Sequence, residues 1–123
     1  MNAISYALAA AIMLSTAPAF AKDPDCGGPN GWPAAMVFVA MKNANIVTND
    51  QLDFSRTQAT RIASEKIGRD LWRQVHLVRY FRNDGSALEA VAVSDSSQEE
   101  CSMGDVQTFV ISKKLLPSGQ NSN

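Results

Sequence analysis

The two cysteines are the residues of this chain whose type most directly allows covalent chemistry. Cys26 opens the stretch CGGPNGWP, and Cys101 lies in EECSMG. Attachment of a lipid is not expected, because residues 22 to 25 separate Cys26 from the apolar leader that precedes it. A catalytic thiolate would need a basic neighbour and a compartment that keeps the thiol reduced. Two cysteines also cannot complete a zinc site without histidine ligands. We therefore predict a structural disulfide between Cys26 and Cys101, with free thiols or a metal site as the alternatives.

The single histidine, His76, lies in a segment rich in strand-forming residues, and we expect it to have a structural role. The chain contains no nucleophile elbow of the Gly-x-Ser-x-Gly type, no His-Glu-x-x-His metal motif and no phosphate-binding glycine loop. Carboxylates are numerous, but no pair of them stands out as a general acid and base. No catalytic residue is predicted.

An acidic loop surrounds Cys101. Its carboxylates are Asp95, Glu99, Glu100 and Asp105. They could supply the hard oxygen ligands that Ca²⁺ prefers, but their spacing matches no calcium-binding loop. We predict a solvated loop with calcium binding as the alternative, and we predict no metal and no cofactor.

The N-terminus resembles an export signal. Residues 1 to 21 carry no charged side chain, residues 3 to 14 are almost entirely apolar, and Ala19-Phe20-Ala21 has the small-x-small pattern that signal peptidases cleave. A membrane anchor is the alternative, but the apolar run is shorter than the roughly 20 residues that a spanning helix needs. We predict a signal peptide at 1–21, a single domain at 22–116 and a disordered tail at 117–123. The protein is expected to be periplasmic or secreted, without stable membrane insertion after cleavage.

Charge is balanced overall but segregated along the chain. The net charge is −1, which argues against nucleic acid as a partner because nucleic-acid binding needs a basic field. From Arg56 to Arg82 there are seven basic and two acidic residues, whereas from Asn83 to Ser112 there are six acidic and no basic residues. The preferred interpretation is that the two segments neutralise each other across a sheet. The alternative is a charged face that meets a charged partner.

The pattern of elements predicts an α+β domain. Pro33 suits the first turn of a helix, and the following residues are apolar on nearly all sides, so we expect this helix to be buried against a sheet. Thr48 and Gln51 have capping-box spacing, which favours a short helical turn around residues 50–54. Residues 55–67 fit either a helix or a strand, and we favour a strand because strongly strand-forming segments follow.

The clearest signal is a hairpin around Asp84-Gly85. With these two residues as its loop, the predicted register pairs Val78 with Val91 and His76 with Val93. Another strand is expected in VQTFVISKKL. The predicted fold is a small single α+β domain with an N-terminal helix packed on an antiparallel β-meander of three to four strands, closed by one disulfide.

These features favour a protein-binding module over an enzyme. About 100 residues form one core without a deep cleft between lobes. We predict a module that binds another protein in the periplasm or outside the cell, as an inhibitor or immunity-type protein. The alternative is a small carboxylate-dependent hydrolase that acts on envelope polymers, with His76 as a candidate participant. The predicted binding residues lie beside the disulfide: Asn30, Trp32, Asp95, Glu99, Glu100 and Asp105. For Trp32 a core position over the sheet is favoured, with an interface anchor as the alternative.

Overall fold

The computed structural model describes residues 22–111 of the chain. The predicted signal peptide at 1–21 and the predicted tail at 117–123 lie outside these residues, as does the end of the predicted domain at 112–116. The described residues correspond to the body of the predicted domain.

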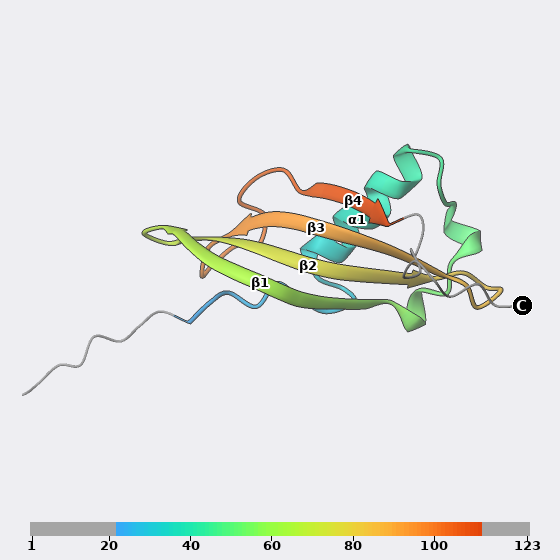
Figure 1. The fold of residues 1–123 in the computed structure, drawn as a ribbon, viewed down its shortest axis with the longest axis horizontal. Helices are drawn as coiled ribbons and strands as arrows, with labels where there is room; N and C mark the ends of the chain where they lie inside the picture. The colour runs from blue at the N-terminus through green and yellow to red at the C-terminus, as the bar shows by residue number, and fades with distance from the viewer. Residues whose placement is uncertain (1–21, 112–123) are drawn as a thin grey trace, which may run out of the picture.

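A four-stranded antiparallel sheet forms one layer of the described residues, with the strands in the order β1-β2-β3-β4. The strands are β1 (Gln58–Gly68), β2 (Leu71–Phe81), β3 (Ala87–Ser96) and β4 (Gln107–Ile111). Each strand pairs with the next along the chain (Figure 1), so the predicted α+β meander is confirmed with four strands. The ambiguous segment at 55–67 is a strand from Gln58 onward, in agreement with the favoured interpretation.

The helix α1 (Trp32–Asn43) begins after a tight turn of the chain. Pro33 lies in its first turn, where a missing N–H costs nothing. Gly31 precedes it in contact with the backbone of Cys26: a Cβ atom at Gly31 would lie 2.5 Å from the Cys26 carbonyl oxygen. The helix can therefore start at this point only because residue 31 has no side chain.

Two short 3₁₀ helices, η1 (Asn49–Gln51) and η2 (Phe54–Arg56), connect α1 to the sheet. The helical turn predicted around residues 50–54 is present as η1, which is shorter and ends at Gln51. The Gln51 side chain accepts a hydrogen bond from the Thr48 backbone N–H at 3.1 Å. These turns bring the chain from the end of α1 to the start of β1.

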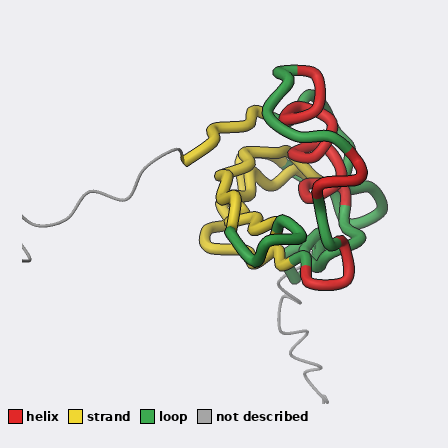
Figure 2. Tube along the Cα trace, turned by 90° about the vertical axis from the view of Figure 1, so that its right-hand side faces the viewer, coloured by secondary structure: helices red, strands yellow, loops and turns green. Residues whose placement is uncertain are grey.

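The apolar core lies between α1 and one face of the sheet. The helices lie on one side of the strands, which gives two layers (Figures 1 and 2). The buried apolar residues are Ala34, Val37, Met41, Val47, Leu52, Val78, Tyr80, Ala90 and Ala92. The Tyr80 hydroxyl donates to the Ala34 carbonyl at 2.6 Å, and burial raises the pKa of Tyr80 to about 12. A neutral tyrosine thereby joins β2 to the first turn of α1.

The same face of the sheet becomes polar toward the β1–β2 turn. Gln74, His76, Ser94 and Ser96 are buried there around Trp72. The N-terminal segment crosses this region: the Pro24 carbonyl accepts hydrogen bonds from Gln74 Nε2 at 2.8 Å and from Arg61 Nη1 at 2.9 Å. The sheet face therefore has an apolar half under α1 and a polar half associated with the N-terminal segment.

The predicted register of the β2–β3 hairpin is wrong by one residue. The loop contains three residues, Asn83 to Gly85, because Arg82 donates its N–H to the Ser86 carbonyl at 2.8 Å. Gly85 has φ of 88°, the left-handed conformation that ends a three-residue loop built on a type I turn. Val78 consequently pairs with Ala90, and His76 pairs with Ala92. A shift of one residue places the alternate side chains of β3 on the opposite face from the predicted one.

Candidate functional site

The predicted disulfide is present. Cys26 and Cys101 are joined with an S–S distance of 2.11 Å and a Cα–Cα distance of 5.6 Å, across a sequence separation of 75 residues. Cys26 is buried, with 2% of its surface exposed. The bond holds the turn before α1 against the loop that follows β3.

Four of the predicted binding residues belong to the two segments that the disulfide joins. We call this surface the disulfide end and define it as Asn30, Trp32, Glu99, Glu100 and Met103. Gly31 touches the backbone of Cys26, so Asn30 and Trp32 stay close to the bond. Glu100 precedes Cys101 directly, and Met103 follows it by two positions. The described structure thus brings together two segments that are far apart in the sequence.

Trp32 does not occupy the core position that was favoured for it from the sequence. Its exposed fraction is 37%, whereas Trp72 is 2% exposed. The buried residues of α1 are Pro33, Ala34, Val37 and Met41. Trp32, at the start of the helix, lies outside this buried set, so a large aromatic surface remains accessible beside the disulfide.

Hydrogen bonds order the acidic loop. Ser97 donates its backbone N–H to the Glu100 carbonyl at 2.8 Å, and its side-chain oxygen accepts from the Glu100 N–H at 3.1 Å. Met103 donates its backbone N–H to the Asp95 carbonyl at 3.1 Å. Gln98 donates its N–H to the Asp70 carboxylate in the β1–β2 turn at 3.0 Å. The loop is therefore fixed at several points in addition to the disulfide.

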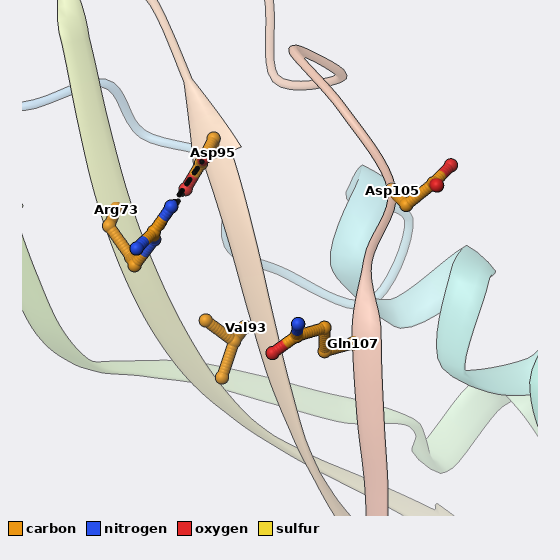
Figure 3. A pocket seen from close by; sticks show the side chains of 5 residues that line it. All are labelled: Arg73, Val93, Asp95, Asp105 and Gln107. Atoms are coloured by element: carbon orange, nitrogen blue, oxygen red, sulfur yellow. Dashed lines mark hydrogen bonds and ion pairs between the residues drawn. The ribbon is translucent and has the colours of Figure 1, made fainter.

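Asp95 and Asp105 line a different surface from the other predicted binding residues. They belong to the walls of a shallow hollow of about 240 Å³, together with Arg73, Val93 and Gln107. Figure 3 shows this hollow across β2, β3 and the start of β4. The predicted site is thus divided between the disulfide end and the sheet, because Asp95 is part of β3 and Glu99 is in the loop after it.

Arg73 is the charged residue of this hollow that the site prediction omitted, along with Val93 and Gln107. Its guanidinium contacts Asp95 through Nε at 2.9 Å and Nη2 at 3.0 Å. The two residues face each other because β2 and β3 pair Arg73 with Asp95. Sequence could have indicated this contact only if the three-residue loop had been recognised, since the assumed two-residue loop displaces every pair by one position.

A second cross-strand ion pair follows the same arrangement. Arg79 lies opposite Glu89 in the register, with Arg79 Nε 2.8 Å from Glu89 Oε1 and Nη2 in contact with the same oxygen. The basic segment and the acidic segment therefore do meet across the sheet, which agrees with the preferred interpretation of the charge pattern.

His76 lies inside the protein. Its exposed fraction is 0%, and neither ring nitrogen has a hydrogen-bond partner among the described residues. Burial lowers the pKa of His76, the Arg61 guanidinium lowers it further, and Asp25 offsets part of this effect. The imidazole is therefore neutral near pH 7 and has no exposed surface for a substrate to contact.

Within residues 22–111, no group of three or more His, Cys, Asp and Glu side chains is arranged to hold a metal ion. In the same part of the chain no helix is long and apolar enough to cross a membrane.

Residues 22–111 form a small α+β domain with one disulfide, in which the disulfide end and the hollow on the sheet are accessible. Comparison of the chain with protein-family models, with curated proteins and with solved structures gave no significant match.

Proposed function

We propose that this chain is an exported protein-binding module that recognises another protein through the disulfide end. The observation that carries the proposal is the 37% exposed Trp32, held beside a disulfide that also fixes an acidic loop. Tryptophan is enriched among the residues that contribute most to protein interfaces. An exposed tryptophan on a rigid support is suited to act as an anchor.

Rigidity supports the same proposal. The disulfide and the hydrogen bonds of Ser97 and Met103 hold the loop in one arrangement before binding. A preorganised surface loses less conformational entropy when a partner binds. A small, rigid surface of this kind fits an inhibitor or an immunity-type protein that blocks an envelope-acting partner.

The chemistry of the surface indicates the kind of partner. Trp32 and Met103 provide accessible apolar surface, with Met103 45% exposed. Glu99 and Glu100 are both exposed and negatively charged. A partner with an apolar pocket bordered by lysine or arginine would match both features.

Export is part of the proposal. A structural disulfide is typical of proteins that fold in an oxidising compartment, and the predicted leader at 1–21 agrees with this. The proposed location is the periplasm or the exterior of the cell.

No observation favours the alternative hydrolase. Its candidate histidine, His76, is fully buried, and the Asp95 carboxylate is engaged by Arg73 through two hydrogen bonds. The binding function is therefore the better supported of the two.

The test combines partner capture with matched substitutions. Protein expressed from the full sequence and purified from the periplasm is used to capture partners from an envelope extract, and its start is established by intact mass. Affinity for a captured protein is then measured for Trp32→Ala and for Glu99→Lys/Glu100→Lys. We expect each variant to bind about tenfold more weakly, which is about 1.4 kcal/mol, with the thermal midpoint nearly unchanged.

Val39→Ala is the control, because Val39 is 42% exposed on the same helix but lies outside the disulfide end. It should bind as the unmodified protein does. Unaltered affinity in both test variants would contradict the proposal and direct attention to the basic residues Arg69, Arg73 and Arg79. Loss of a catalytic activity on substitution of one carboxylate, with folding intact, would favour the hydrolase.

A further inference from the structure

The sheet has one face that no described element covers. We call it the open face, and it consists of the alternate residues of β2, β3 and β4 that point away from α1. Its apolar members include Val75, Leu77, Val91, Val93, Phe109 and Ile111. The side chains of β4 are the most accessible, with Phe109 58% and Ile111 43% exposed. An apolar surface that extends over three strands is typical of an interaction site.

Charged residues border this apolar surface in an ordered way. Arg73 and Arg79 lie on β2, and Asp95 and Glu89 lie opposite them on β3. The two ion pairs are separated by about 20 Å along the strands, at roughly 3.3 Å per residue. Between them lie Val75, Leu77, Val91 and Val93. On this face, β2 carries two positive charges, β3 carries a negative charge opposite each of them, and β1 carries Glu65 opposite Arg73.

This arrangement is self-complementary under a twofold rotation. The axis runs parallel to the strands, above the open face and midway between β2 and β3. Rotation about it places β2 of a second copy over β3 of the first, and each residue keeps its position along the strand direction. Arg73 then lies over Asp95 of the second copy, and Arg79 lies over Glu89 of the second copy. The apolar residues of β2 meet those of β3. Self-complementarity of this kind is the requirement for a closed twofold interface.

We propose that the open face binds a second copy of this chain, so that the protein forms a dimer with its two sheets packed face to face. The axis runs along the strands between β2 and β3, so the strands of the two sheets run in the same direction and the sheets are aligned. The net charge of each copy is only −1, so long-range repulsion between copies is small.

The charges also select this orientation over the other face-to-face arrangement. A twofold axis perpendicular to the strands would place β2 over β2 and bring Arg73 over Arg79 of the second copy. Like charges in contact across an interface are unfavourable. The hairpin register therefore determines the geometry of the dimer as well as the fold of the monomer.

The hollow on the open face fits the same interface. Asp105 lines it and has no ion-pair partner among the described residues. In the proposed dimer, Arg73 of the second copy lies above β3 near the hollow, where Asp95 and Asp105 are its walls. Glu65 lies opposite Arg73 on the same face, so Asp105 has both Arg73 and Glu65 of the second copy near it on association.

Two complementary variants test the proposal. Arg73→Glu/Arg79→Glu has an acidic open face, and Glu89→Lys/Asp95→Lys has a basic one. Both lose the ion pairs within the chain, so any difference between the separate and the mixed samples reports contacts between copies. Sedimentation velocity over a concentration series should show a dimer for the unmodified protein, monomers for each variant alone, and a dimer containing one copy of each when the variants are mixed.

A second pair of variants tests the apolar part of the interface. Phe109→Lys places a charge on the open face at a site that is largely exposed in the monomer, so the domain is expected to fold and to remain monomeric. Val39→Lys alters an exposed apolar residue on α1, in the other layer, and is expected to dimerise normally. Circular dichroism establishes that all variants are folded.

A monomeric unmodified protein throughout the series would overturn the proposal, as would the absence of a mixed dimer between two folded charge variants. Dimerisation that persists in Phe109→Lys would also overturn it. The result does not depend on the binding function, because Trp32 belongs to α1 in the other layer and is not part of the open face.

Discussion

At the scale of single residues, the least expected feature is the buried polar group around His76. Gln74, His76, Ser94 and Ser96 are at most 2% exposed, and each has at least one polar atom without a hydrogen-bond partner among the described residues. Burial of polar atoms without partners is costly. We therefore expect this end of the sheet to be less stable than the apolar half under α1 and its stability to depend on His76 remaining neutral.

Acid should destabilise the protein through His76. Burial and Arg61 lower the pKa of His76, with Asp25 acting in the opposite direction, so the unfolded chain takes up a proton at a pH where the folded chain does not. The contribution of neutral His76 is complete above pH about 6.5 and is lost as the pH falls toward the lowered pKa of the folded state. The expected slope is at most about 1.4 kcal/mol per pH unit. Urea unfolding in buffers that span the histidine titration range measures it.

His76→Gln is the control for this prediction, because glutamine is polar and does not titrate. The free energy of unfolding of this variant should vary less with pH than that of the unmodified protein over the same range. Equal slopes in the two proteins would assign the pH dependence to other groups.

Placement of His76 and Trp32 was predictable to different degrees. The strand around His76 is rich in strand-forming residues, so its position in β2 followed from local sequence. Trp32 stands at the junction of a turn and a helix, where its exposure depends on the angle at which α1 meets the sheet. That angle is a property of packing, and the favoured core position was wrong.

At the scale of elements, the β2–β3 hairpin determines the two faces of the sheet. Asp84 accepts hydrogen bonds from the Ser86 N–H at 2.8 Å and from the Ser86 hydroxyl at 2.6 Å. Gly85 follows in the left-handed conformation. Asp-Gly is compatible with both two-residue and three-residue loops, so the dipeptide identified the hairpin but left its register open.

Replacement of Gly85 by alanine should destabilise the hairpin by about 1 kcal/mol, since alanine at positive φ is strained. A Cβ atom at Gly85 would meet nothing within 4 Å, so the cost is conformational rather than steric. Urea unfolding of Gly85→Ala gives the change in free energy.

Gly104→Ala is the matched control, because a Cβ atom at Gly104 also meets nothing within 4 Å and Gly104 is not among the glycines of positive φ. It should leave the stability nearly unchanged. Equal losses in the two variants would contradict the conformational explanation.

The helix α1 shows a similar division between local and tertiary information. Its apolar composition correctly predicted a helix packed on the sheet. The composition also suggested burial on nearly all sides, yet Trp32 and Val39 are exposed, at 37% and 42%. In a domain with two layers the sheet covers only one side of the helix, so the other side stays accessible whatever its composition.

At the scale of the whole molecule, the disulfide contributes much of the stability. It closes a loop between positions 75 residues apart, and the loss of chain entropy in the unfolded state corresponds to about 4 kcal/mol. Domains of this size have total stabilities of roughly 5–15 kcal/mol. The N-terminal segment has few other attachments, among them the hydrogen bond from the Gly28 N–H to the Ala59 carbonyl at 3.2 Å.

Removal of the disulfide in Cys26→Ala/Cys101→Ala should therefore lower the free energy of unfolding by about 4 kcal/mol. Urea unfolding measures the loss, and the unmodified protein with reductant provides a second route to the same state. The double variant and the reduced unmodified protein should also lose protection from hydrogen exchange around Trp72, next to the N-terminal segment. A stability equal to that of the oxidised protein would show that the bond does not constrain the unfolded chain as expected.

The sequence by itself determined the elements and the disulfide. Two cysteines leave one possible pairing, Pro33 marks the start of a helix, and Asp84-Gly85 marks a hairpin. Tertiary structure decided how these parts face one another: the register of β2 and β3, the exposure of Trp32, and the separation of Asp95 and Asp105 from Glu99 and Glu100. Local signals depend on a few neighbouring residues, so they can be read along the chain. The face to which a side chain points changes with a single residue of register, and the register is fixed by the conformation of Gly85 together with the packing of the sheet against α1.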